Sequence, residues 1–368
     1  MGEAARPQEH LLILLPASVP DAVIDDLRRS FPNIEITHLQ IGLDETVDAV
    51  PSELLERTTI LATSFRHVPT PQQVPNLKLL HSFSAGMDHL LNAPLVTDTN
   101  IPITTSSGIH GPPIAEWTIL NWLVASKHYN ELYEAQKKHE WKKQTSFATS
   151  IEDHVGKRVG ILGYGSIGRQ IGRVAVALGM KVLAYTASPR DTPESRRDKG
   201  YIVPGTGDPD GTLPISWHHG TDKESLRAFL AQDLDHVVVS LPLTPATTHL
   251  LGAEEFAVLS SHSTGTRKPF ITNISRGKIV DQDALIAALK NGQLSGAALD
   301  VTDPEPLPAD HPLWDAPNVQ ISPHISGLGK EYFARSLDVL KVNLIYILAS
   351  RIELQGYLLN SLNAYVGF

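Results

Sequence analysis

Residues 159–186 read VGILGYGSIGRQIGRVAVALGMKVLAYT, and this stretch decides the fold. The short apolar run Val159–Leu162 is typical of a strand that is buried on both faces. Apolar residues spaced three or four apart then predict a helix, and Lys181–Tyr185 supplies a second strand. Between the first strand and the helix stand three glycines in the spacing G-x-G-x-x-G, namely Gly163, Gly165 and Gly168. Because strand, glycine turn, helix and strand are all present, the stretch predicts a dinucleotide-binding turn rather than a structural loop.

The glycines of such a turn have separate tasks. One makes the tight turn, one lets the backbone approach a pyrophosphate, and one lets the helix pack closely on the strand. The free N–H groups at the start of the helix then face the phosphates. The predicted cofactor contacts of the turn are therefore Gly163, Tyr164, Gly165, Ser166, Ile167 and Gly168.

The bulk properties narrow the class of protein. The chain has 368 residues, which favours two domains, and its composition, with 42% hydrophobic and 19% charged residues, is that of a globular protein. A net charge of −9 argues against a nucleic-acid partner. The sequence has no cysteine, which excludes disulfides and thiolate sites and fits a reducing compartment. No apolar run approaches the length of a membrane span. We expect a cytoplasmic protein with no membrane partner.

The first hundred residues alternate strand-like and helix-like segments. Strands are predicted at 11–15, 33–37, 59–63, 78–82 and 103–105, with a helix over 21–30. This pattern indicates a small α/β unit with a parallel sheet. The loop Ser84-Ala85-Gly86-Met87-Asp88 follows a predicted strand, which is where ligands bind to such sheets.

A long helix is expected from Ile114 to about Lys138, with Trp117, Leu120, Leu123 and Val124 on its apolar side and Pro112-Pro113 in its first turn. The segment from Pro189 to Asp222 holds five prolines and five glycines in 34 residues. We interpret it as an irregular surface excursion, and we favour a surface insertion without a functional role over a functional loop. A last helix is expected over 332–349.

After the excursion the α/β pattern resumes. Helices are predicted at 223–232, 253–259 and 281–291, the last with Asp281 as N-cap. Strands are predicted at 236–240, 270–273, 296–299 and 319–322. With the two strands of the glycine stretch they make six, which is a full dinucleotide-binding sheet.

Three chemically capable side chains follow three of these strands. Arg276 offers a planar fork for a carboxylate. His324 is of the one side-chain type that titrates near neutral pH when unperturbed, and Glu305 could hold its imidazole. Each residue alone has an ordinary structural explanation, but all three fall on the edge of the sheet where the glycine turn lies. The pattern predicts binding of an anionic substrate next to a proton-exchanging group.

Four segments carry a family resemblance: LPLTPATTHLLG, NISRGKIVDQDALIAAL, GAALDVTDPEPLPADHPLWDAPNV and SPHISG. Together they resemble the D-isomer-specific 2-hydroxyacid dehydrogenases, strongly over residues 110–330 and fairly elsewhere. The resemblance implies a Rossmann NAD(P)-binding domain at 119–328, inserted into a flavodoxin-like substrate domain at 1–118 and 329–368. It also implies a homodimer formed through the domain-crossing helix.

The resemblance further implies a role for each site residue. Arg276 would bind the carboxylate and carbonyl of a 2-oxoacid, and His324 would give its proton to the carbonyl oxygen as hydride arrives from the nicotinamide. Glu305 would pair with His324 and keep it protonated, and a Glu here argues against formate oxidation. Backbone groups near Ala85 and Gly86 would complete carboxylate binding. The remaining cofactor contacts would come from Leu241, Pro242, Thr247, Ile274 and Asp300, with no metal involved.

One position departs from the family pattern. NAD-dependent members carry an Asp shortly after the second strand of the glycine stretch, where its carboxylate takes both ribose hydroxyls. Here Thr186 stands at that place, followed by Ser188 and Arg190. A carboxylate would repel a 2′-phosphate, whereas these side chains could bind one. We expect NADP to be favoured over NAD; the alternative is that the loop ignores the ribose and either cofactor serves.

Two functions from different classes fit these observations. The first is a reductase that converts a small 2-oxoacid into a D-2-hydroxyacid. The second is a nicotinamide-sensing binding protein of the corepressor type, because such proteins resemble the family and can retain the Arg, Glu and His. Corepressors typically add disordered tails, and the short predicted termini favour the enzyme. Which 2-oxoacid is reduced stays open, although Phe65, Phe83, Met87, Ile109 and Trp314 suggest an apolar pocket or simple packing.

Overall fold

The structure is a computed structural model that describes residues 9–42, 44–88, 90–264 and 268–353. The chain forms two compact units, Met1–Ile109 with Gly329–Phe368, and His110–Leu328. The junction lies ahead of the predicted boundary at residue 119, because helix α4 (Gly111–Ser126) packs along its length on α6 (Ser166–Ala177) of the second unit. No helix in the described ranges is both long and apolar enough to span a bilayer.

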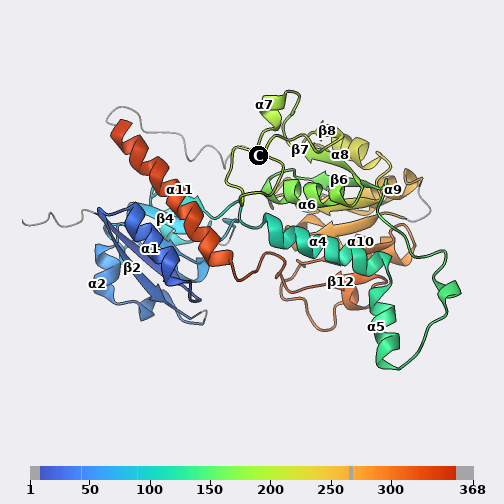
Figure 1. The fold of residues 1–368 in the computed structure, drawn as a ribbon, viewed down its shortest axis with the longest axis horizontal. Coiled ribbons are helices and arrows are strands. Elements are labelled where there is room, and N and C mark those ends of the chain that lie inside the picture. The colour runs from blue at the N-terminus through green and yellow to red at the C-terminus, as the bar shows by residue number, and fades with distance from the viewer. Residues whose placement is uncertain (1–8, 43, 89, 265–267, 354–368) are drawn as a thin grey trace, which may run out of the picture. The chain divides into compact units, whose positions relative to one another are not determined.

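The first unit is built on a five-stranded parallel sheet (Figure 1). Its strand order is β2-β1-β3-β4-β5, the order of a flavodoxin-like sheet, as predicted. The strands are β1 (Glu9–Leu15), β2 (Ile34–Gln40), β3 (Ile60–Thr63), β4 (Leu79–Ser82) and β5 (Ile103–Thr105).

Both faces of this sheet are covered. Leu11 and Ile13 pack with α1 (Asp21–Ser30) and α11 (Tyr332–Glu353) on one face. The alternate residues Leu12 and Leu14 pack on the other face, where α2 (Ser52–Arg57) and α3 (Pro94–Thr97) contribute Leu55 and Leu95. Because successive strand residues point to opposite faces, an unbroken run of leucine and isoleucine is what a doubly covered strand requires.

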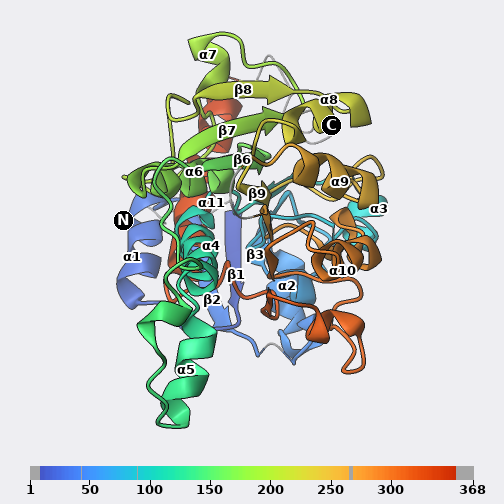
Figure 2. The same ribbon diagram turned by 90° about the vertical axis from the view of Figure 1, so that its right-hand side faces the viewer.

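The second unit holds a seven-stranded parallel sheet in the order β12-β11-β10-β9-β6-β7-β8. This is the dinucleotide-binding order with an added strand at one edge. Figure 2 shows β6, β7 and β8 of this sheet side by side. The strands are β6 (Arg158–Leu162), β7 (Lys181–Thr186), β8 (Ser216–His219), β9 (His236–Val239), β10 (Phe270–Asn273), β11 (Gly296–Leu299) and β12 (Val319–Ile321).

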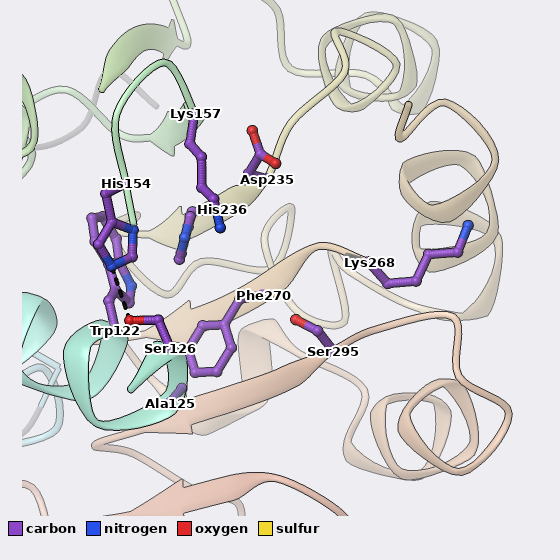
Figure 3. Close-up of a pocket in the computed structure, with 10 residues that line it drawn as sticks. All are labelled: Trp122, Ala125, Ser126, His154, Lys157, Asp235, His236, Lys268, Phe270 and Ser295. Atoms are coloured by element: carbon purple, nitrogen blue, oxygen red, sulfur yellow. Dashed lines mark hydrogen bonds between the residues drawn. The ribbon is translucent and has the colours of Figure 1, made fainter. Parts of the chain in front are cut away.

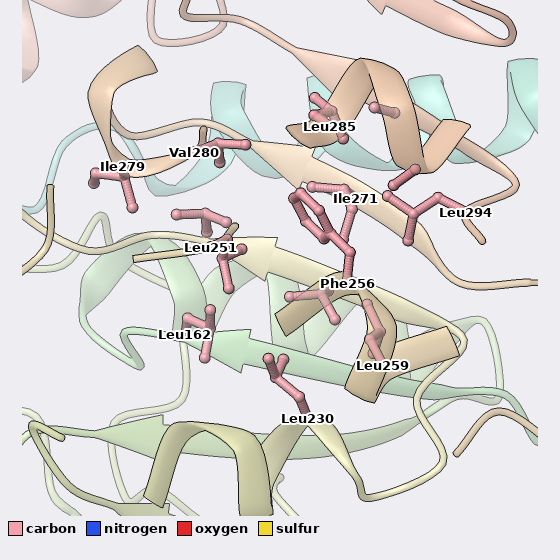
Figure 4. Packing of buried hydrophobic residues seen from close by; sticks show 14 of the residues in the cluster. Leu162, Leu230, Leu251, Phe256, Leu259, Ile271, Ile279, Val280, Leu285 and Leu294 are labelled. Atoms are coloured by element: carbon pink, nitrogen blue, oxygen red, sulfur yellow. The ribbon is translucent and has the colours of Figure 1, made fainter. Parts of the chain in front are cut away.

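Helices cover both faces of this sheet as well. On one face lie α8 (Lys223–Leu230), α9 (Ala253–Ser261) and α10 (Gln282–Lys290). Their leucines interlock with Leu162 and Ile271 of the strands around the buried ring of Phe256 (Figure 4). On the other face α4 and α6 pack against the sheet, with the indole of Trp122 fully buried.

The single helix predicted over 114–138 is wrong. His128 adopts a left-handed φ of 53°, which ends α4 and starts a separate helix α5 (Tyr129–Lys137). The predicted apolar side is also wrong. Helix α4 buries Ile114, Ala115 and Trp122, among others, and leaves Leu120 58% exposed.

The predicted excursion at 189–222 is more ordered than its composition indicates. It holds a short helix α7 (Pro193–Arg196) and ends in β8, which pairs with β7 from Leu183↔Ser216 to Thr186↔His219. The sheet therefore has seven strands where the sequence predicted six. His218-His219 belongs to this edge strand, and the Nε2 atom of His218 lies 3.1 Å from the hydroxyl oxygen of Ser216.

Candidate functional site

The glycine turn joins β6 to α6 and has the close contacts that its motif predicts. Gly163 has a φ of 91°, and a Cβ built there would lie 2.3 Å from the carbonyl oxygen of Ser240. A Cβ on Gly168 would lie 2.3 Å from the carbonyl oxygen of Gly163. Both contacts exclude any larger residue. A Cβ on Gly165 would meet nothing within 4 Å, so the backbone at this N-cap of α6 faces open space. This is the arrangement that a pyrophosphate requires.

The end of β7 lies beside the turn, because β6 and β7 pair in register. The hydroxyl of Thr186 donates to the carbonyl of Ser188 at 2.8 Å, and Ser188 is exposed. Arg190 is half-buried and donates from its guanidinium to the carbonyl of Ser195 at 2.7 Å. The first acid beyond the strand, Asp191, is exposed. No carboxylate therefore occupies the position after the strand where a ribose-binding acid is expected.

Arg276, Glu305 and His324 come from three neighbouring strands. Arg276 follows β10, Glu305 follows β11 and His324 follows β12, and these strands are adjacent and parallel. The carboxyl ends of adjacent parallel strands share one edge of a sheet, so the loops that follow them meet there. The imidazole Nδ1 of His324 lies 3.1 Å from Oε1 of Glu305. Both side chains are about two-fifths exposed, at 41% and 38%, which leaves them accessible to a ligand.

The loop that carries His324 is held by Asp300. The Asp300 carboxylate is 1% exposed and accepts bonds from the hydroxyls of Ser322 and Ser326 and from the backbone N–H of Ile325 and Ser326. The carbonyl of Asp300 also accepts from the backbone N–H of His324 at 2.8 Å. These bonds maintain His324 at a φ of 56°, a backbone conformation that is uncommon for a non-glycine residue. The family resemblance implied a cofactor contact for Asp300 and gave no sign of this structural role.

The residue after Arg276 must be a glycine because the backbone near Thr302 passes very close to it. A Cβ at Gly277 would lie 2.0 Å from the carbonyl of Thr302, so the backbone after β11 passes directly against this residue. The close approach keeps the loops that carry Arg276 and Glu305 together. Arg276 is half-buried, and its guanidinium donates to the carbonyl of Ser275 at 2.7 Å.

The other predicted cofactor residues divide into two groups. Leu241 lies next to the turn, since a Cβ on Gly163 would be 3.3 Å from its Cδ2. The side chains of three others make contacts within the protein. The hydroxyl of Thr247 donates to the carbonyl of Pro242 at 2.8 Å, while Ile274 and Tyr164 are buried in the core. Contacts of Ile274 and Tyr164 with a cofactor would have to come from their backbone, whereas Thr247 is partly exposed.

Two predicted substrate residues belong to the first unit. Ala85 and Gly86 follow β4 and are partly exposed. Of the residues that suggested an apolar pocket, Phe83 and Ile109 are 1% and 2% exposed and act as packing, whereas Phe65 and Trp314 are 39% and 50% exposed.

A small cavity lies at the amino ends of the strands of the second sheet, opposite the ends that carry the glycine turn (Figure 3). Its lining includes His236 and Phe270, the first residues of β9 and β10, together with Ser126 and His154. Burial lowers the pKa of His154 to about 4. The cavity measures about 20 Å³, enough for roughly one water molecule. It is too small for a dinucleotide or a 2-oxoacid and lies far from the glycine turn along the strands.

Comparison with known proteins identifies relatives over most of the chain. The family model of the D-isomer-specific 2-hydroxyacid dehydrogenase NAD-binding domain matches residues 119–203 and 213–326. A glyoxylate reductase of Thermofilum pendens is 30% identical over 276 residues, which cover 74% of this chain and 73% of the relative. A solved D-isomer-specific 2-hydroxyacid dehydrogenase family protein of Aeromonas salmonicida is 27% identical with a TM-score of 0.71, covering 93% of this chain and 96% of that one.

A further solved structure is that of the NADPH-dependent glyoxylate/hydroxypyruvate reductase from Sinorhizobium meliloti in complex with NADP and sulfate. It is 26% identical with a TM-score of 0.65, and the match covers 96% of this chain and 97% of that one.

Proposed function

Because the chain belongs to the D-isomer-specific 2-hydroxyacid dehydrogenase family and is an NAD(P)-dependent oxidoreductase, we propose that it reduces a small 2-oxoacid to a D-2-hydroxyacid. The observation that carries this proposal is the pairing of His324 with Glu305 at the sheet edge shared with Arg276 and the glycine turn. The nicotinamide supplies the hydride when the cofactor is bound.

The chain's own residues have four tasks in the proposed reaction. Arg276 binds the substrate carboxylate through its planar guanidinium. His324 holds a proton on its imidazole and gives it to the carbonyl oxygen of the substrate. Glu305 accepts a bond from Nδ1 of His324, which directs Nε2 toward the reacting oxygen. Asp300 keeps the loop of His324 in place.

We assign the cofactor to the glycine turn and the end of β7. Helix α6 has 12 residues, and open space lies before its N-terminus. Gly165 and Ser166 at this N-terminus would bind the pyrophosphate. Thr186, Ser188 and Arg190 favour a 2′-phosphate, which a carboxylate at this place would repel. The NADPH-dependent relative from Sinorhizobium meliloti supports a preference for NADPH.

The experiment is a spectrophotometric scan of NADPH and NADH oxidation with glyoxylate, hydroxypyruvate, pyruvate, phenylpyruvate and branched 2-oxoacids. We expect turnover with at least one of the small acids and a higher kcat/KM with NADPH. A clear NADH preference would contradict the cofactor assignment. Absence of turnover on every acid would contradict the reductase, and would favour the nicotinamide-sensing binding protein, which the comparisons do not otherwise support.

We also propose a homodimer. Helix α4, helix α5 and the segment after α5 carry exposed apolar residues, and Figure 1 shows α5 projecting from the body of the second unit. The exposed residues are Leu120, Leu123, Tyr129, Leu132, Tyr133 and Trp141. An exposed patch of this kind marks an interaction site. A cytoplasmic location stays a prediction from the sequence.

A further inference from the structure

The loop 204–212 lies outside the family match, which covers 119–203 and 213–326. Its sequence, PGTGDPDGT, looks like an exposed turn, yet Gly207, Asp208 and Gly211 are buried. A Cβ on Gly211 would lie 2.4 Å from the carbonyl oxygen of Arg196, so the loop packs tightly against the segment that follows β7. A loop that buries a carboxylate against a cofactor-binding element needs a physical explanation.

Asp208 is the buried carboxylate of this loop and is 4% exposed. Its Oδ1 accepts the backbone N–H of Thr212 at 3.0 Å, and its Oδ2 accepts that of Leu213 at 3.2 Å. These two bonds close the loop on itself. Oδ2 also accepts the phenol of Tyr164 at 3.1 Å, across 44 positions of sequence. Asp208 therefore connects the loop to the glycine turn.

Tyr164 is the residue between the first two glycines of the turn. Its ring is 3% exposed and meets the indole of Trp217 edge-on at 5.2 Å. A Cβ on Gly172 would lie 2.8 Å from the phenol oxygen, so a glycine in α6 makes room for the ring. Burial, and next the negative charge of Asp208, raise the pKa of the Tyr164 phenol. The phenol therefore stays a hydrogen-bond donor at neutral pH.

Arg169, in the first turns of α6, provides a second connection. It is 4% exposed, and its guanidinium donates to the carbonyls of Asp208 and Arg196, both at 2.6 Å. The guanidinium of Arg196 in turn donates to the carbonyl of Arg190 at 2.8 Å. A continuous series of bonds thus runs from the glycine turn through the 204–212 loop to Arg190, the residue assigned to the 2′-phosphate.

We propose that the 204–212 loop is an affinity element for the dinucleotide, and that Asp208 and Tyr164 are positioning residues. The proposal rests on the proposed function only for the identity of the cofactor. Asp208 fixes the side chain of Tyr164, and so holds the backbone of the glycine turn ready for the pyrophosphate. Through Arg169 the same loop holds the Arg190 segment in register with the turn. A turn that is ordered before binding loses less entropy when the cofactor arrives.

The test uses two variants of the full-length chain, Tyr164→Phe and Asp208→Asn. Tyr164→Phe removes one oxygen from a buried ring and keeps its packing. Asp210→Asn is the control, because Asp210 lies in the same loop but is exposed and pairs with the exposed Arg197 at 3.5 Å. Calorimetry gives the Kd for NADPH. Steady-state kinetics separate KM from kcat, and hydrogen exchange without cofactor reports on residues 163–169 and 190–197.

Loss of the Tyr164–Asp208 bond in Tyr164→Phe should raise the Kd for NADPH about tenfold. Asp208→Asn should raise it as well, because one amide oxygen cannot accept from Thr212, Leu213 and Tyr164 as the two carboxylate oxygens do. At saturating cofactor, kcat should stay within about twofold, since the bond does not touch the reacting atoms. Amides 163–169 should exchange faster than in the wild type, and Asp210→Asn should match the wild type in every measurement.

An unchanged Kd with unchanged exchange in Tyr164→Phe would overturn the inference, as would a fall in kcat with no change in Kd. If Asp208→Asn does not fold, Tyr164→Phe alone decides the question. A wild-type protein that binds NADPH but reduces no 2-oxoacid would refute the proposed function while the Kd comparison still tests the loop. A wild-type protein that binds neither NADPH nor NADH would refute the loop's role.

Discussion

At the scale of single residues, His324 is the group on which the proposed chemistry depends. Replacement of His324 by Gln keeps the volume and a hydrogen-bonding amide but removes the exchangeable imidazole proton. Positioned proton transfer contributes about 10²–10⁴ in rate, so kcat should fall by that factor while the Kd for NADPH stays unchanged. Single-turnover and steady-state kinetics with the preferred 2-oxoacid measure the loss. A variant with near-normal kcat would remove His324 from the mechanism.

The support for His324 could be predicted only in part. Its partner Glu305 was predicted and lies 3.1 Å away. The four donors that Asp300 gathers from residues 322–326 were not, because sequence gives no sign that a carboxylate after β11 turns toward the next loop rather than toward a ligand. A buried carboxylate is stable only where donors surround it. Ser322 and Ser326 are possible donors in the sequence, but they do not show which way the carboxylate turns.

At the scale of elements, the end of β7 decides between the two nicotinamide cofactors. Thr186→Asp places a carboxylate where the ribose-binding acid of NAD-dependent relatives is expected. We expect kcat/KM with NADPH to fall about tenfold or more through repulsion of the 2′-phosphate, while the value with NADH holds or rises. Thr192→Asp is the control, because it adds the same charge at the N-cap of α7, where Asp caps equally well. Equal effects of the two substitutions would mean that any added negative charge in this region weakens NADPH binding, and would contradict specific recognition of the ribose.

The elements that sequence predicted best are those whose local signals and tertiary burial agree. The glycine turn, the doubly covered strands and the Asp281 cap are of this kind, and Asp281 does accept the N–H of Ala284. Helix α4 was misjudged because apolar residues occur on nearly all of its sides, so periodicity could not select the buried face. Strand β8 was missed because Ser-Trp-His-His has no strand pattern and pairs with β7 alone. The Asp208–Tyr164 contact could not be predicted from the sequence, because the two residues are 44 positions apart.

At the scale of the whole molecule, the proposed homodimer predicts a concentration-dependent mass. The chain has a mass of 40.1 kDa, and light scattering should give twice that value at micromolar concentration. Trp141 is 94% exposed, so Trp141→Glu leaves the packing of the monomer intact. If its indole is buried between protomers, loss of such an anchor should raise the dimer Kd by about thirtyfold or more. Ile215→Glu, at another exposed apolar position in the second unit, should remain dimeric. A wild-type mass of 40.1 kDa at all concentrations would refute the dimer.

Buried histidines in both units contribute to the pH dependence of stability. Burial lowers the pKa of His81 in the first unit, and of His110 and His154 in the second, to about 4. Unfolding returns each to its ordinary value of 6.5, so between pH 6.5 and 4 the unfolded chain binds more protons than the folded one. The stability that these three histidines contribute is therefore fully present above pH 6.5 and is lost as the pH falls toward 4.

His81 gives the sharpest test of this pH dependence. Its imidazole is fully buried, with Nδ1 2.9 Å from the Thr104 hydroxyl and Nε2 3.2 Å from that of Ser106. One such histidine lowers the free energy of unfolding by about 1.4 kcal/mol for each pH unit in the window. Urea denaturation between pH 7.5 and 4.5 should show His81→Gln losing that much of the slope, whereas His219→Gln, at an exposed position of β8, keeps the full slope. If His81→Gln leaves the pH slope of the free energy of unfolding unchanged, the His81 imidazole must be able to take up a proton in the folded protein. The hydroxyls of Thr104 and Ser106 would then accept hydrogen bonds from it.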